Sequence, residues 1–374
     1  MFFTIKVIMF RNWKLFLFRF AAWILNKIII MKKLITLLSL AVVGFTFGQD
    51  EEPKLNLSGS VDAYYRANLD APNDENAIAP GSRFANLPGF SLGMANIVAS
   101  YEASNVGVVA DLVFGPRGTD AVFASPMNSN SANIINQMYA YWNVNETVTL
   151  TMGNFNTFLG YEVISPVGNF NYSTSYLFSY GPFSHTGLKA DFDFGDEFTL
   201  MAAIMNPTDL TEYNPTGDYS IGLQFGFKGQ YLNYLSSQGA FEVDFTGGIE
   251  FSDSFFLGIN AAYFDATDDI DVDTSFAGVA LYPQLSTSEK FSLGLRAEYF
   301  VETEGGVNAI GAYDFKGDAD VFAVTLTGNY SVGNLMIKPE LRLDSACEDA
   351  TFMDNNLNPS NSLSSFVLAA VYSF

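Results

Sequence analysis

The chain has 374 residues, with 18 lysines and arginines against 40 acidic residues and a formal net charge of −22. That charge opposes binding to phosphate backbones, so we expect no nucleic-acid partner. Cys347 and His185 are the only residues of their kinds, which excludes an internal disulfide and any multi-histidine or cysteine-based zinc site. We therefore expect no metal and no cofactor. Aromatic and charged residues each make up 16% of the chain. This composition is too apolar for a disordered chain and too weakly charged for the surface of an ordinary soluble protein.

The first 49 residues are typical of a targeting segment rather than of a fold. Residues 31–49 (MKKLITLLSLAVVGFTFGQ) combine a basic start, a short apolar run and small residues before a cut at Gln49, the pattern of a Sec signal peptide. We interpret residues 1–30 as an over-extended gene start ahead of Met31, with an uncleaved membrane anchor as the alternative. The remainder, residues 50–374, holds 11 basic and 40 acidic residues, a net charge of −29.

From residue 54 onward, apolar and polar residues alternate with a period of two, which predicts β-strands with one apolar face. In the first strand Leu55, Leu57 and Val61 share one face, while Asp62 and Arg66 share the other. The predicted strands cover residues 54–69, 90–102, 105–114, 133–144, 147–156, 185–194, 197–206, 218–228, 230–236, 240–251, 254–265, 274–285, 290–300, 319–331, 334–344 and 362–374. The strand at 230–236 is the least regular of the sixteen, and fourteen strands remain the alternative.

The connections between these strands alternate between short turns and long loops rich in Gly, Asn, Asp and Pro. Short turns on one rim and long loops on the other are typical of a transmembrane antiparallel up-and-down β-barrel. In lipid only a closed sheet satisfies every backbone amide of its strands. We therefore predict an all-β outer-membrane barrel over residues 50–374, with a secreted β-sandwich or small soluble barrel as the alternative. Trp142, beside the turn at 145–146, is expected on the outer face at the membrane interface, or else in a buried core.

Several segments carry a family resemblance that spans most of the chain after residue 50. Residues 153–187 (GNFNTFLGYEVISPVGNFNYSTSYLFSYGPFSHTG), 276–284 (FAGVALYPQ), 294–300 (GLRAEYF) and the C-terminal VYSF resemble the OmpL-like β-barrel porin family (β-barrel porin-2) of Gram-negative outer membranes. The resemblance implies Sec export to the periplasm, insertion into the cell outer membrane, and contact with its lipid and lipopolysaccharide. Phe374 resembles the terminal aromatic of outer-membrane assembly signals, which implies the barrel-assembly machinery as a partner.

Charged residues on the polar face of the strands are the candidate pore lining, because lumen charges sort solutes. They could create a transverse field across the lumen, or they could only pair with one another and stiffen the wall. The candidates are Arg66, Asp111, Lys189, Asp191, Lys228, Arg296, Glu298, Lys338, Glu340 and Arg342.

The loop at 157–184 is the longest and most aromatic connection. It could fold into the lumen as a constriction, or it could pack on its own rings outside the barrel. Its candidate residues are Tyr161, Glu162, Tyr172, Tyr176 and Tyr180, followed by His185 at the start of the next strand. A lipase-type serine two residues after His185 is absent, since position 187 is Gly, so we expect no enzyme.

Acidic residues crowd the loop around 265–273, but the glycine and glutamate that an EF-hand requires are missing. An acidic rim of this kind enriches cations at the mouth of a pore. The favoured function is passive diffusion of small hydrophilic solutes or ions through a charged, loop-constricted lumen. The alternative is a non-conducting barrel that acts as an adhesin or structural anchor through its acidic loops. The sequence leaves open whether the barrel is a monomer or a homo-oligomer.

Overall fold

The computed structural model describes residues 53–122, 133–195, 197–267, 273–304 and 306–374. The predicted signal peptide and upstream segment at 1–49, and Asp268, Asp269 and Asp271 of the acidic loop, lie outside the described residues. No helix in the described part of the chain is long and apolar enough to cross a membrane.

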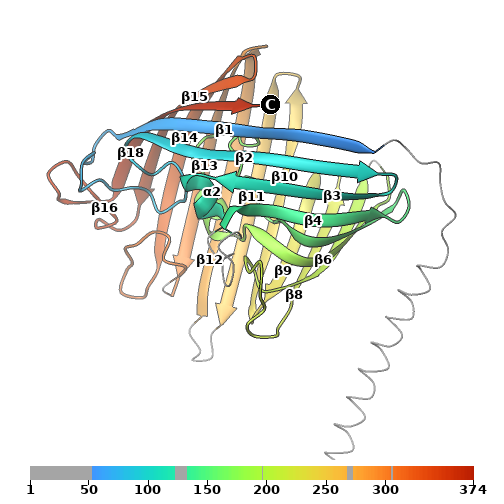
Figure 1. Ribbon diagram of the computed structural model, residues 1–374. Helices are drawn as coiled ribbons and strands as arrows, with labels where there is room; N and C mark the ends of the chain where they lie inside the picture. Colours follow the sequence, from blue (N-terminus) through green and yellow to red (C-terminus); the bar gives the residue numbers. More distant parts are fainter. Residues whose placement is uncertain (1–52, 123–132, 196, 268–272, 305) are drawn as a thin grey trace, which may run out of the picture. The chain divides into compact units, whose positions relative to one another are not determined.

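Sixteen long strands close into one antiparallel barrel (Figure 1). In chain order they are β1 (Lys54–Asn68), β2 (Gly89–Ala103), β3 (Val106–Phe114), β4 (Ile135–Asn143), β5 (Val148–Asn156), β6 (Ser184–Asp193), β7 (Phe198–Met205), β8 (Ser220–Phe227), β9 (Gln230–Ser237), β10 (Ala240–Ser252), β11 (Phe255–Thr267), β12 (Asp273–Ser288), β13 (Phe291–Thr303), β14 (Ala319–Val332), β15 (Leu335–Ala346) and β18 (Ser362–Ser373). The loops add helices α2 (Pro116–Ala121) and α3 (Tyr176–Tyr180) and a small hairpin of β16 (Phe352–Met353) and β17 (Pro359–Ser360).

The first and last strands close the barrel. β1 pairs with β18 from Ser60↔Ser373 to Asn68↔Ser365. At the short-turn end, Gly59 and Phe374 exchange two backbone hydrogen bonds of 3.0 Å. Every other strand pairs with its neighbours in chain order, apart from the small β16–β17 hairpin, which forms a separate sheet. The all-β class, the antiparallel barrel and the sixteen strands predicted from the sequence are therefore confirmed.

Two connections show why the least regular strand, β9, is nevertheless correct. Lys228 and Gly229 both have positive φ (51° and 75°), as do Gln238 and Gly239 (50° and 85°). Positive φ at both central residues is the geometry of a tight two-residue hairpin. β9 is therefore joined tightly at both ends, to β8 and to β10. The short link at 238–239 lies on the rim that otherwise carries the long loops.

The alternating pattern separates two faces of the wall. Along β1, Ser60, Asp62, Tyr64 and Arg66 are buried, and the residues between them are exposed or half-buried. The exposed large side chains of the strands are mostly apolar, including Val108, Met152, Ile204, Leu326 and Leu341. An apolar outer band is the surface that a lipid bilayer requires.

Apolar clusters also fill part of the interior, because loop residues pack there against inward-facing side chains. The largest cluster joins Tyr176 and Leu177 of α3 to Phe276, Tyr282 and Phe300 of the wall. The interior of this barrel therefore holds folded chain, and that chain sets the geometry of the candidate site.

Candidate functional site

The connection from β5 to β6, residues 157–183, lies against the inner wall of the barrel. Tyr172 and Tyr176 of this inner loop are each only 1% exposed. Tyr172 donates its hydroxyl hydrogen to Asp62, an inward residue of β1. Burial raises the pKa of the Tyr172 hydroxyl, so it stays protonated as a donor. Of the two placements left open by the sequence, the loop adopts the one inside the wall.

Two wall carboxylates hold the backbone of the inner loop. Glu298 of β13 accepts hydrogen bonds from the amides of Tyr176 (2.9 Å) and Leu177 (2.8 Å). Glu340 of β15 accepts from the amides of Tyr172 (2.8 Å) and Ser173 (3.1 Å). Both carboxylates are almost fully buried. Hydrogen bonds to a charged acceptor are among the stronger ones in proteins, so these glutamates fix the loop at two points.

Three wall cations hold the loop's carbonyl oxygens in the same way. Arg296 donates to Ser173 O (2.6 Å) and Arg342 to Thr174 O (2.9 Å). Lys338 donates to the backbone oxygens of Pro166 and Asn169. Each of the three cations is at most 3% exposed.

Carboxylates complete the pairing of the two arginines. Arg296 forms an ion pair of 2.6 Å with Glu162 of the inner loop. Glu162 also accepts hydrogen bonds from the amide and hydroxyl of Ser175, which caps helix α3. Arg342 pairs with Asp344 two residues along its own strand, at 2.7 Å. Half of the predicted pore-lining charges, on β13 and β15, therefore serve to anchor the loop.

Two further buried arginines, Arg66 and Arg117, donate hydrogen bonds to loop carbonyl oxygens inside the barrel. Arg66 of β1 is 1% exposed and donates to Asn86 O, and its Nη2 atom has no partner among the described residues. Arg117 of α2 donates to the backbone oxygens of Ile164 and Tyr172 and lies over the Phe84 ring at 4.5 Å. Sequence reasoning missed Arg117 because its candidates were charges on predicted strands, whereas α2 lies in the connection between β3 and β4. The local signal in the sequence was the Pro116-Arg117 pair, because proline often occupies the first position of a helix.

The remaining predicted residues lie apart from this cluster. Asp111 of β3 accepts hydrogen bonds from Asn96 and Asn136. Lys189 and Asp191 pair at 3.1 Å on β6 and keep 25% and 38% of their side-chain surface exposed. Asp111 lies on β3, and the other two lie on β6, the strand that follows the inner loop. No contact in the described part of the chain joins Asp111, Lys189 or Asp191 to the backbone of the inner loop.

Lys228 was predicted on the inner wall, but it lies outside the strand. β8 ends at Phe227, and Lys228 occupies the turn with φ 51° and pairs with the exposed Glu197 at 3.0 Å. The alternation of the sequence continues one residue beyond the strand, and this overrun produced the error.

The aromatic candidates and His185 pack against, or hydrogen-bond to, other residues of the barrel interior. Tyr161 stacks on Tyr282 of β12 at 4.2 Å between ring centroids, and Tyr180 donates to Gly81 O. His185 is fully buried, and its Nε2 atom lies 3.0 Å from Thr157 Oγ1. Its ring packs near Phe158. In the described part of the chain, no group of three or more His, Cys, Asp or Glu residues could hold a metal ion.

A family model described as "Putative beta-barrel porin-2, OmpL-like" matches residues 54–374. No curated protein matches the chain. Among solved structures, the barrel is similar to a loop-deletion mutant of OmpT, an outer membrane protein of Vibrio cholerae, with 10% identity, TM-score 0.52, and coverage of 87% of this chain and 100% of the other.

Two further outer-membrane barrels are similar to the same extent. The outer membrane channel DcaP of Acinetobacter baumannii has 13% identity and TM-score 0.51, with 88% and 99% of the two chains covered. An anion-selective porin from Comamonas acidovorans has 11% identity and TM-score 0.53, with 86% and 100% covered. At these identities the likeness establishes the barrel fold alone.

Proposed function

This chain belongs to the OmpL-like beta-barrel porin-2 family of outer-membrane barrels, and from that membership we propose that it conducts small hydrophilic solutes or ions by passive diffusion. The observation that carries the proposal is the inner loop, residues 157–183, bound inside a closed sixteen-strand wall by buried charges. A barrel of this size is too wide for wall side chains alone to fill. A folded segment inside it therefore narrows the route without needing a separate plug domain.

The proposed route runs beside the inner loop rather than through it. Glu298, Glu340 and Arg342 are bound to the loop and cannot face a passing solute. Lys189 and Asp191 keep exposed surface, and opposite charges on a channel wall orient polar solutes. We assign the solute-facing role to this pair.

The rims and the termini complete the proposal. The long-loop rim faces the cell exterior. The start of β1 and the end of β18 face the periplasm, since short turns mark the periplasmic side of such barrels. Residues 31–49 act as the signal peptide. Phe374, bonded to Gly59 at the closing seam, is recognised by the barrel-assembly machinery. An acidic mouth gives a mild preference for cations, which declines as salt increases.

Single-channel recording tests the function. The barrel, residues 50–374, is refolded, its folding is verified by a heat-modifiable gel shift, and it is inserted into a planar bilayer in KCl. Steady ohmic steps are expected, and a tenfold KCl gradient should give a reversal potential of the cation-selective sign. A folded barrel that never conducts refutes the pore and supports an adhesin or anchor role for the long loops. Conduction with an anion-selective reversal potential refutes the proposed effect of the acidic mouth.

A further inference from the structure

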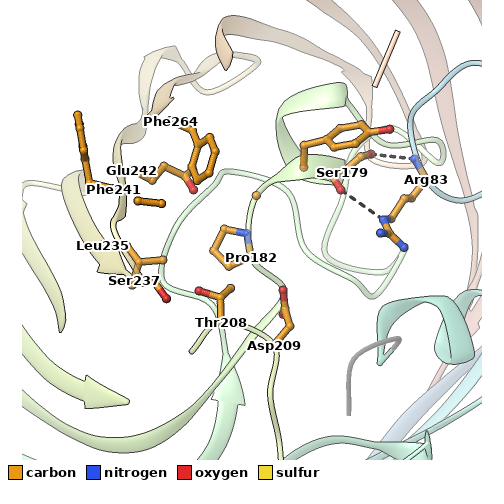
Figure 2. Close-up of a pocket in the computed structure, with 13 residues that line it drawn as sticks. Arg83, Ser179, Pro182, Thr208, Asp209, Leu235, Ser237, Phe241, Glu242 and Phe264 are labelled. Carbon is orange, nitrogen blue, oxygen red and sulfur yellow. Dashed lines mark hydrogen bonds between the residues drawn. The ribbon is translucent and has the colours of Figure 1, made fainter. Parts of the chain in front are cut away.

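A partly open cavity of about 210 Å³ lies at the long-loop end of the interior, beside the inner loop (Figure 2). Pro182 and Gly181 of the inner loop line it, together with Thr208 and Asp209 of the β7–β8 loop. Glu242, Leu235 and Phe264 line it from strands β10, β9 and β11. None of the wall charges that anchor the inner loop takes part in this cavity.

Glu242 differs from every anchoring carboxylate described above. It is 6% exposed, and no group among the described residues donates a hydrogen bond to its side chain. Glu298 and Glu340, buried to a similar degree, each accept two backbone amides. A buried carboxyl group can stay ionised only where a cation or hydrogen-bond donors meet it, and otherwise it takes up a proton. The Glu242 carboxyl faces a cavity instead, next to the backbone of Gly181.

A second acid faces the same cavity. Asp209 accepts hydrogen bonds from the amides of Phe183 and Ser184. Asp244 of β10 and, to a lesser degree, Asp209 act on Glu242 electrostatically. Arg83, at the cavity edge, has its own partners, since it pairs with Asp120 at 3.2 Å and donates to Ser179 O. The cavity therefore places two carboxyl groups beside apolar walls.

We propose that this cavity, here called the Glu242 cavity, binds the head group of a small organic cation. An ammonium or guanidinium group lies between Glu242 and Asp209, and its short apolar chain packs against Leu235 and Phe264. An organic cation fits better than a metal ion, because hard divalent cations take six or more oxygen ligands and the wall offers two carboxylates. The inference rests on the proposed function, since it names the class of solute that the pore retains near its mouth.

Calorimetric titration of the barrel, purified from outer membranes in detergent, tests the site. The probe is butylammonium chloride, and butyramide is its neutral counterpart of similar shape. Saturable binding of butylammonium and none of butyramide are expected. Glu242→Gln and Asp209→Asn should each weaken binding about tenfold or more, the loss expected for one charge-assisted hydrogen bond.

The matched control is Glu250→Gln, the same substitution at an exposed residue of the same strand. It should leave the affinity within about twofold, which is less than the effect of one hydrogen bond. Equal affinity in wild type and Glu242→Gln, or equal binding of butyramide, overturns the site.

KCl conductance, recorded on the same preparation, separates the two hypotheses. A folded, conducting barrel that does not bind butylammonium overturns the Glu242 cavity and leaves the pore standing. A barrel that binds butylammonium through Glu242 but never conducts refutes the pore and leaves the binding site standing.

Discussion

Releasing the inner loop from its two glutamates tests how the lumen is narrowed. In the double variant Glu298→Ala/Glu340→Ala, four loop amides lose their carboxylate acceptors. Even at the net value of a neutral hydrogen bond, about 1 kcal/mol, the loop loses about 4 kcal/mol of anchoring, and bonds to a charged acceptor are stronger. That free energy corresponds to a rise of about a thousandfold in the ratio of open to closed loop states.

The assay is single-channel recording with the occupancy of high-conductance substates as its readout. The double variant should spend far more time in wider substates than wild type, and limited proteolysis should cut the loop within 157–183. The control is Glu250→Ala, which removes an inward-phase carboxyl of β10 that is exposed and makes no contact with the loop among the described residues. Unchanged substate occupancy together with unchanged proteolysis in a folded double variant would refute the loop as the constriction.

Three shorter predictions follow from the same structure. Arg342→Ala should lower the free energy of unfolding, measured by urea titration in vesicles, by about 3–5 kcal/mol, because Asp344 loses its ion-pair partner while it stays buried. Adding Asp344→Ala to this variant should recover part of the loss. Burial raises the pKa of Asp209 from its ordinary 3.8 to about 6. Its contribution to the free energy of unfolding should therefore fall as pH rises from about 4 to about 6 and then stay level. The variant Asp209→Asn should lack this slope, and an identical slope in the variant contradicts the assignment. Trp142, which pairs with Leu150 beside a short turn, should lie at the lipid interface, so brominated lipid should quench its fluorescence. Subtracting the fluorescence of Trp142→Phe from that of wild type isolates the Trp142 signal. Equal Trp142 fluorescence in brominated and ordinary lipid would place the ring away from lipid.

The strands were predictable because their information is local. Alternation between polar and apolar residues is imposed separately on each strand by lipid on one side and the interior on the other, so a single strand such as β1 reveals its own faces. The same rule fails at a strand end, as Lys228 shows, because alternation does not record where a turn begins.

The position of the inner loop could not be predicted in this way. Glu340 and Ser173 lie 167 residues apart in sequence, and nothing near either residue specifies the other. A buried charge on a strand is compatible with a solute, with another charge or with a backbone amide, and the choice depends on which segment folds against it. Glu242 occupies a buried position of β10, but its lack of a partner depends on three loops and three strands together.

The seam between β1 and β18 has a consequence for the synthesis of the protein. Ser60 finds its partner at Ser373, so the barrel cannot close until almost the whole chain has been made. Before that point both terminal strands present unpaired amides and carbonyls, and such free edges promote aggregation. Contacts of such high sequence separation also form slowly, because a very long loop must be closed first. We expect the exported chain to need a holding factor that shields both edges, and removal of β18 to leave the other fifteen long strands without a stable end state.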